Sequence, residues 1–151
     1  MKIGILKETM EGECRVAATP ETVKKMIGLN HSVLIEAEAG FGASISDENY
    51  KSHGAKIVSR SQALQSDLLL MVRPLDEKEL ISLKPTQFMV GMLEPFNNEL
   101  QALLKKQGLS AFALEALPRN TRAQSMDVLS SQANIAGYKA VILAADYYKK
   151  F

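Results

Sequence analysis

The sequence predicts an α/β fold, in which an open, mostly parallel sheet is flanked by helices. Short apolar runs alternate along the chain with longer amphipathic segments. Several of the short runs are apolar throughout, which is typical of strands buried on both faces of a parallel sheet. Residues that favour helix starts precede the longer segments. Together these observations predict strand–helix units joined by right-handed crossovers, in a Rossmann-like or flavodoxin-like three-layer arrangement.

Six short apolar runs are the predicted strands. They cover residues 3–6, 33–37, 56–58, 67–72, 87–92 and 109–114. Capping signals locate the clearest helices between them. Thr19 is a good N-cap before Pro20, and proline is favoured at the first helical position. Ser46 begins a second, shorter helix, and residues 97–107 form an amphipathic helix that ends at Gly108.

The last predicted helix differs from the others. From about Ser125 to the end of the chain it consists mostly of Ala, Val, Ile, Leu and Tyr. It is apolar on too many sides to lie on a surface, and no stop signal follows it. We therefore expect an α/β domain over residues 1–124 and, over residues 125–151, a long interdomain helix that leads to a further domain.

Composition excludes several classes of protein. The 151 residues fit one domain with a substantial core. The formal net charge of +1 gives no reason to expect a nucleic-acid partner. No apolar run approaches the ~20 residues of a membrane helix, so we expect no direct membrane insertion. The single cysteine, Cys14, excludes an internal disulfide.

Polar side chains gather where the sixth predicted strand gives way to the last helix, over residues 118–127. Two interpretations stand side by side. Asp127 or Ser125 caps the helix, and the arginines pair with acids. Alternatively, these groups bind a neutral ligand that carries an amide and hydroxyl groups. In that case Asp127 accepts from a ribose hydroxyl, Arg119 donates to a carboxamide oxygen, and Gln124 does either.

Arg15 lies just beyond the carboxyl end of the first predicted strand, the edge at which open α/β sheets bind ligands. It can hold a substrate carboxylate, or it can pair with Glu8 or Glu13 as a structural residue.

Residues 40–45 contain the first two glycines of a dinucleotide-binding loop but have Ile45 where the third belongs. A tight turn is therefore the preferred interpretation. His31 and His53 have no Cys or carboxylate cluster at metal-binding spacing, so no metal site is predicted.

The same segments resemble a known family. Residues 4–8, 15–23 and 40–47 are similar to the alanine dehydrogenase and pyridine nucleotide transhydrogenase family. Residues 118–138 resemble in particular the transhydrogenase branch, at the Arg-Gln-Asp loop of its NAD(H)-binding component on the alpha subunit. The resemblance spans essentially the whole chain.

This resemblance implies roles for particular residues. Arg119, Gln124 and Asp127 fall on the loop that reaches the nicotinamide and its ribose, and they are the implied catalytic group. Ser130 joins them in binding the cofactor, as does Asn120 through its backbone.

The resemblance also implies a function: hydride transfer from NADH to NADP⁺ coupled to proton translocation. NADP(H) would bind a partner subunit or domain, and a Rossmann domain following in the chain would hold the phosphates and adenosine of NAD(H). The implied assembly is a homodimer with membrane-spanning and NADP-binding components, at the cytoplasmic face of the bacterial inner membrane. Residues 1–151 alone would be inactive.

Two departures from the family's pattern bear on this prediction. Leu6 stands where the family usually has proline. Alanine dehydrogenases also use a lysine after the fourth strand and a histidine after the fifth, whereas here Arg73 stands nearest the lysine position and residues 87–100 contain no histidine. Without that acid/base pair, amino-acid oxidation has no obvious proton acceptor. Two alternatives stay open: the substrate domain of an alanine-type dehydrogenase, with Arg15 on the carboxylate, and a non-catalytic ligand-binding or assembly module.

Overall fold

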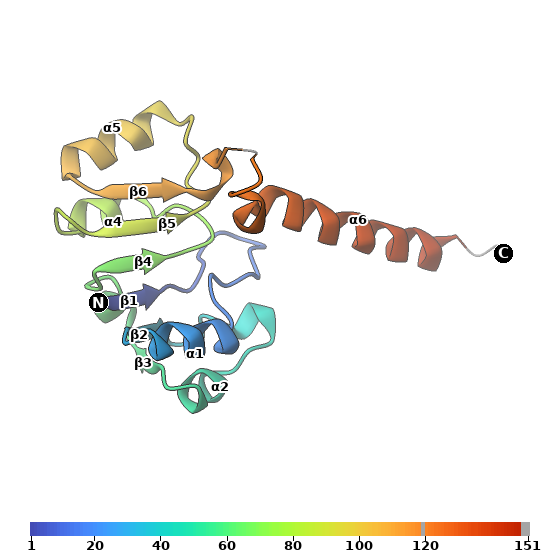
Figure 1. Cartoon of the computed structure of the whole chain (residues 1–151), viewed down its shortest axis with the longest axis horizontal. Helices are drawn as coiled ribbons and strands as arrows, with labels where there is room; N and C mark the ends of the chain where they lie inside the picture. The colour runs from blue at the N-terminus through green and yellow to red at the C-terminus, as the bar shows by residue number, and fades with distance from the viewer. Residues whose placement is uncertain (119, 149–151) are drawn as a thin grey trace. The chain divides into compact units, whose positions relative to one another are not determined.

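The computed structural model describes residues 1–118 and 120–148. The chain forms two compact units, Met1–Ala113 and Leu114–Phe151. The first unit holds the sheet and the α-helices α1 to α5 (Figure 1). Its elements in chain order are β1 (Lys2–Ile5), α1 (Pro20–Gly28), β2 (Ser32–Glu36), η1 (Phe41–Ala43), α2 (Asp47–Ser52), β3 (Lys56–Val58), α3 (Arg60–Ala63), β4 (Leu68–Leu70), α4 (Glu77–Ser82), β5 (Phe88–Gly91), α5 (Asn98–Gln107) and β6 (Ser110–Ala113).

The six strands form one parallel sheet in the order β3-β2-β1-β4-β5-β6. Ile3 of β1 pairs with Val33 of β2 on one side and with Leu68 of β4 on the other. The chain adds β2 and β3 on one side of β1 and then adds β4, β5 and β6 on the other side. The order of the strands therefore reverses between β1 and β4, while all strands stay parallel. This confirms the predicted Rossmann-like parallel sheet, and each predicted strand lies within about two residues of an observed one.

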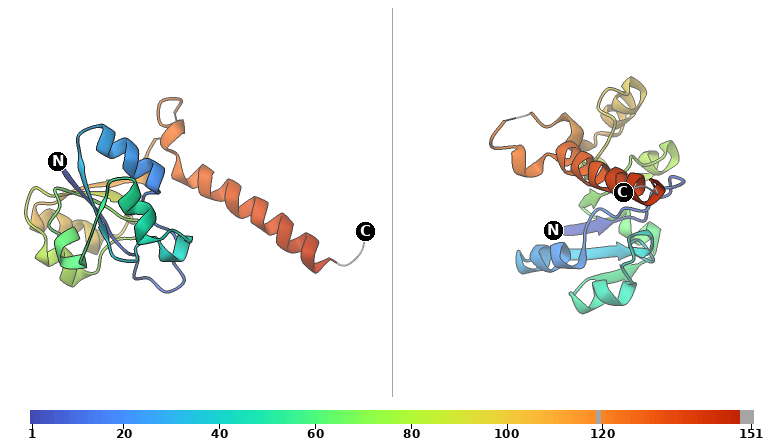
Figure 2. Two further views of the ribbon diagram at one scale, coloured as in Figure 1. Left: turned by 90° about the horizontal axis from the view of Figure 1, so that it is seen from below. Right: turned by 90° about the vertical axis from the view of Figure 1, so that its right-hand side faces the viewer.

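Two cores cover the two faces of the sheet, and Figure 2 shows helices on both sides of it. On the first face, α1 and α2 pack on β1 and β2, around Ile5, Val33 and Tyr50. On the opposite face, α3, α4 and α5 pack over Leu69 and Met89. Right-handed crossovers explain this division, because the chain continues on the other side of β1 after β3.

Local capping explains where the helices begin. Thr19 accepts a hydrogen bond from the backbone N–H of Thr22, and Ser46 caps α2 in the same way. Gly108, with a φ of 67°, ends α5 as predicted. The sequence pattern did not reveal α3 and α4. Both are short, although Asp76 gives α4 an ordinary cap by accepting from the N–H of Glu79.

The glycines of residues 40–45 serve close packing. The segment turns through η1, as the tight-turn interpretation expects. A Cβ on Gly40 would lie 2.8 Å from the backbone oxygen of Ile45 and from Cε2 of Tyr50. A Cβ on Gly42 would lie 3.0 Å from Cα of Cys14. A residue with a side chain at either position would therefore have to displace the neighbouring segment.

The second unit contains η2 (Leu114–Ala116), η3 (Gln124–Met126) and α6 (Val128–Tyr147). The final helix begins three residues later than predicted, because Asp127 is its N-cap and Ser125 belongs to the preceding 3₁₀ turn. Most of its apolar side chains are exposed in this chain by itself, and its role as an interdomain helix stays a prediction. None of the helices in the described ranges has the length and apolar character of a membrane span.

Close contact between α3 and β1 gives a direct test of the fold. A Cβ on Gly4 would lie 2.5 Å from the backbone oxygen of Ala63 and 2.7 Å from Oγ of Ser66. Gly4→Ala should therefore destabilise the chain by about 1–3 kcal/mol in urea denaturation. Gly28→Ala, where nothing lies within 4 Å of an added Cβ, is the matched control and should be neutral or slightly stabilising. Equal stabilities for the two variants would contradict the packing described.

Candidate functional site

A polar cavity of about 570 Å³ lies within the second unit, where the chain enters α6. Its size falls in the usual range for small-molecule sites, about 300–1,000 Å³. The residues that line it are Leu117, Pro118, Asn120, Thr121, Ala123, Gln124, Asp127, Ser130 and Ser131. The structure therefore brings together four of the five residues predicted to bind the cofactor. The fifth, Arg119, lies outside the described residues.

Asp127 is both the cap of α6 and a wall of this cavity. One carboxylate oxygen accepts a hydrogen bond of 3.0 Å from the backbone N–H of Ser130, and the other accepts one of 2.6 Å from the Ser130 hydroxyl. Asp127 therefore caps α6, as the first of the two interpretations predicts. Capping does not exclude ligand binding, because an ionised carboxylate offers about four acceptor positions.

The loop before α6 orients the other polar side chains. Oδ1 of Asn120 accepts from the N–H of Ala123 at 3.0 Å, which closes a turn and keeps this amide bonded to its own loop. Gln124 is exposed in the turn η3 and lines the cavity beside Asp127. The cavity therefore presents a carboxylate, amides and hydroxyls, and this donor set suits a neutral ligand with amide and hydroxyl groups.

A second polar cluster lies in the first unit, at the carboxyl edge of the sheet. Glu13 accepts hydrogen bonds from the Arg15 side chain at 2.6 and 2.7 Å and from Nε of Arg73 at 3.1 Å. These bonds, those from Arg15 first, lower the pKa of Glu13 to about 2. Arg15 thus makes the ion pair that its structural interpretation predicts, and the single carboxylate of Glu13 is shared between Arg15 and Arg73.

Glu8 ties the loop after β1 to the loop after β4. Its carboxylate accepts from the backbone N–H groups of Val72 and Arg73, at 2.6 and 3.0 Å. Burial raises the pKa of this carboxyl group although both bonds favour its charged form. Nearby, Arg60 pairs with Glu36 and Glu79 and donates to the backbone oxygen of Lys7.

These ion pairs surround a smaller cavity of about 230 Å³ in the first unit. It is lined by residues that include Glu8, Arg60 and Arg73. The sequence analysis did not single out Arg60. Its position could have indicated it, because Arg60 directly follows β3 at the edge of the sheet where ligands bind. No group of three or more His, Cys, Asp or Glu residues that could hold a metal ion occurs in the part of the chain that the structure describes.

Comparison with known proteins identifies the family. The family model "Alanine dehydrogenase/PNT, N-terminal domain" matches residues 4–136. The chain belongs to this family. An alpha-subunit chain of the NAD(P) transhydrogenase of Rhodospirillum rubrum is 46% identical to this N-terminal domain, over 94% of the chain and 39% of the relative. The NAD(P) transhydrogenase subunit alpha of Haemophilus influenzae is 40% identical, over 100% of the chain and 30% of the relative.

Solved structures separate the two branches of the family. The crystal structure of transhydrogenase from Sinorhizobium meliloti matches 99% of this alanine dehydrogenase/PNT domain with a TM-score of 0.94 and 41% identity. An L-alanine dehydrogenase matches 80% of it with a TM-score of 0.75 and 31% identity. The chain spans 46% and 35% of these two proteins. Its similarity is thus greater to the transhydrogenase branch, and it covers less than half of each relative.

Glu13 gives a pH-dependent test of the arginine cluster. A carboxyl group with a pKa near 2 when folded and near 4.3 when unfolded stabilises the protein above the higher value. That stability is lost as pH falls from about 4.5 to 2. Glu13→Gln should lower the free energy of unfolding at pH 7 by about 1–3 kcal/mol and remove this part of the acid dependence.

Urea denaturation at several pH values measures both effects, and Glu11→Gln, an exposed position in the same loop, is the control. If the two variants have the same stability profile, the bridging role of Glu13 is wrong.

Proposed function

We propose that this chain is the N-terminal part of the NAD(H)-binding component of a proton-translocating NAD(P) transhydrogenase. The observation that carries the proposal is the polar cavity at the start of α6, in a chain whose fold matches a transhydrogenase with a TM-score of 0.94. The relatives named as alpha subunits of NAD(P) transhydrogenase are longer than this chain, so a complete subunit would supply the remainder of the nucleotide site.

The cavity fits the nicotinamide end of NAD(H) in its chemistry. This end of the dinucleotide carries a carboxamide and ribose hydroxyls. The carboxylate of Asp127 can accept from a ribose hydroxyl, and the Gln124 amide can donate and accept. Neither a glycine-rich loop nor a cluster of cations lines the cavity among the described residues, so the phosphates and adenosine would bind a Rossmann domain elsewhere in the subunit.

The roles of these residues are positional and electrostatic. NAD(H), when bound, supplies the hydride, while the protein fixes the orientation of the ring. Asp127 is itself held by its two bonds from Ser130, so its carboxylate is oriented before a ligand arrives. Gln124 and, from the sequence, Arg119 would orient the carboxamide. None of these groups needs to act as a general acid or base.

The proposed assembly follows from the same similarity. The subunit would work as a homodimer with membrane-spanning and NADP(H)-binding components, peripheral to the cytoplasmic face of the bacterial inner membrane. The names of the relatives from Rhodospirillum rubrum and Haemophilus influenzae support a multi-component enzyme, since both are called alpha subunits.

An alanine-type dehydrogenase is the second candidate, and the small cavity at the sheet edge is the observation in its favour. Arg15, the residue predicted to hold the substrate carboxylate, does not line this cavity, whereas Arg73, which shares the carboxylate of Glu13 with it, does. The pairing of Arg15 and Arg73 with Glu13 weighs against this role, because a carboxylate substrate would have to compete with Glu13. Alanine-dependent reduction of NAD⁺ by the complete protein would favour the dehydrogenase.

Asp127→Asn separates ligand binding from capping. Asparagine caps helices about as well as aspartate, so the start of α6 should be preserved. The charge-assisted bond to a ribose hydroxyl would be lost, and hydride transfer should slow by roughly 10- to 100-fold. The measurement is transhydrogenation by the complete reconstituted enzyme, with Ser125→Ala as a control, since Ser125 does not line the cavity. Unchanged turnover in Asp127→Asn would refute the assigned role.

Residues 1–151 alone should bind NADH weakly and show no transhydrogenation, because the cavity offers partners for the nicotinamide end only. Isothermal titration should give a dissociation constant well above the micromolar range, roughly millimolar for a ligand held by a few hydrogen bonds. A micromolar constant would show that this chain holds the pyrophosphate as well.

A further inference from the structure

Both backbone groups of Asn120 are engaged within its own loop. Its N–H donates to the carbonyl oxygen of Pro118 at 3.0 Å, and its carbonyl oxygen accepts from the N–H groups of Ala123 and Gln124 at 3.1 and 3.0 Å. A carbonyl oxygen has two lone pairs, so these two bonds use both of them. Any contact of Asn120 with a ligand therefore falls to its side chain, whereas the resemblance to the family implies one through its backbone.

The side-chain amide of Asn120 is held at one end. Its Oδ1 accepts a hydrogen bond of 3.0 Å from the backbone N–H of Ala123, a residue that is 6% exposed. Because an N–H can only donate, this bond identifies which end of the amide is the oxygen. Among the described residues Nδ2 donates no hydrogen bond, although Asn120 lines the cavity. Asn120 therefore brings an oriented NH₂ group to the cavity wall.

The start of α6 contributes acceptors to the same cavity. The hydroxyl of Ser130 donates to the carboxylate of Asp127 at 2.6 Å, and the hydroxyl of Ser131 donates to the backbone oxygen of Asp127 at 3.0 Å. Both hydroxyl hydrogens are thus engaged within the helix, and an ionised carboxylate has none to donate. Within the described lining, the donors come instead from residues 120–124 of the preceding loop.

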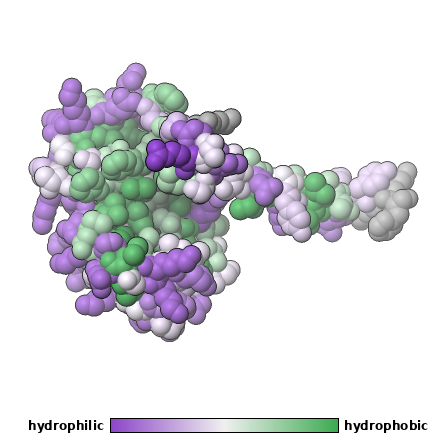
Figure 3. All heavy atoms as spheres, in the orientation of Figure 1, coloured by the Kyte–Doolittle hydropathy of each residue, from purple (hydrophilic) through white to green (hydrophobic). Residues whose placement is uncertain are grey.

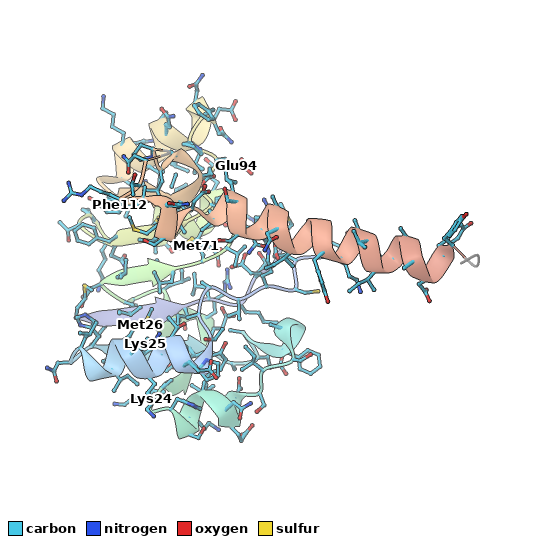
Figure 4. The ribbon with its side chains drawn as sticks, turned by 45° about the vertical axis from the view of Figure 1, so that its right-hand side comes forward. Lys24, Lys25, Met26, Met71, Glu94 and Phe112 are labelled. Carbon is cyan, nitrogen blue, oxygen red and sulfur yellow. The ribbon has the colours of Figure 1, made fainter. Side chains whose placement is uncertain are left out.

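The pictures agree with this division between loop and helix. Figure 3 shows hydrophilic side chains gathered where the chain enters α6. Figure 4 shows the side chains of the preceding loop beside the first turn of the helix. A ligand in the cavity therefore meets donors from the loop and acceptors from α6.

A carboxamide group needs partners of both kinds. Its NH₂ group donates two hydrogen bonds, and its oxygen accepts two. The acceptors of α6 suit the NH₂ group, whereas the oxygen needs donors, and a polar atom left unpaired in a binding site lowers affinity. The amide of Gln124 can supply one donor, and Nδ2 of Asn120 can supply another.

We propose that the side chain of Asn120 is a further ligand-binding residue, in which Nδ2 donates to the carboxamide oxygen of the nicotinamide. This inference rests on the proposed function, because it concerns the same cavity. One amide then has two tasks: Oδ1 closes the turn, and Nδ2 binds the ligand. Because the turn fixes Oδ1, the donor is oriented before a ligand arrives.

Asn120→Asp separates the two tasks. A carboxylate oxygen can still accept from the N–H of Ala123, so the turn should be preserved, but an acceptor replaces the donor. Isothermal titration of NADH into the complete subunit should give a dissociation constant about 10-fold higher than for the unmodified subunit. Ser125→Asp adds the same charge nearby, at a position that does not line the cavity, and should leave the affinity unchanged.

The thionicotinamide analogue of NADH identifies the atom that receives the bond. Sulfur is a weak acceptor, so the unmodified subunit should bind this analogue less tightly than NADH, and Asn120→Asp should weaken its binding little further. An equal loss with both dinucleotides would reflect the added charge rather than the lost donor, and it would overturn the proposal.

The remaining outcomes separate this proposal from the function on which it rests. Equal NADH affinities of the unmodified and Asn120→Asp subunits would overturn the role of Asn120 and leave the proposed function intact. A complete unmodified subunit that does not bind NADH would overturn both. Amide NMR spectra of residues 120–127 verify the turn in the variant. If Asn120→Asp disturbs it, Asn120→Ser can close a similar turn with a shorter side chain and should show the same loss.

Discussion

A parallel sheet must be covered on both faces, and this constraint organises the first unit of the protein. Because crossovers are right-handed, the reversal between β1 and β4 sends α1 and α2 to one face and α3, α4 and α5 to the other. Two separate cores result. On the first face, towards β6, Phe88 and Phe112 remain 43% and 58% exposed.

The reversal also determines where the polar groups meet. The carboxyl ends of β1 and β4 are adjacent, and there Glu8 accepts from the backbone N–H groups of Val72 and Arg73, while Glu13 accepts from the side chains of Arg15 and Arg73. The carboxylates at this edge are thus already engaged with groups of the chain itself. The cavity in the second unit differs, because the exposed Gln124 and the capping Asp127 present polar atoms along its wall. That contrast favours the second cavity as the ligand site.

Local signals made much of the fold predictable from the sequence. Continuous apolar runs revealed the strands, and Thr19, Ser46 and Gly108 marked helix ends through contacts within a few residues. The short helices α3 and α4 carry too few residues for a periodic pattern. The bridge from Glu13 to Arg73 spans 60 positions in sequence, so no local rule could reveal it.

The candidate site was predictable in composition but not in role. Asp127 satisfies the requirements of a helix cap and of a ribose ligand with the same atoms, and the sequence cannot separate the two. The exposure of α6 could not be predicted either, because an apolar helix implies burial without naming the surface that covers it.

The central claim, that the cavity before α6 receives the nicotinamide end of a dinucleotide, can be tested directly by NMR. Nicotinamide mononucleotide carries this end without the adenosine, and it can be titrated into isotope-labelled residues 1–151. We expect chemical-shift changes concentrated in the backbone amides of residues 120–131. Changes concentrated instead around Arg15 and Arg73, or no changes at millimolar ligand, would contradict the claim.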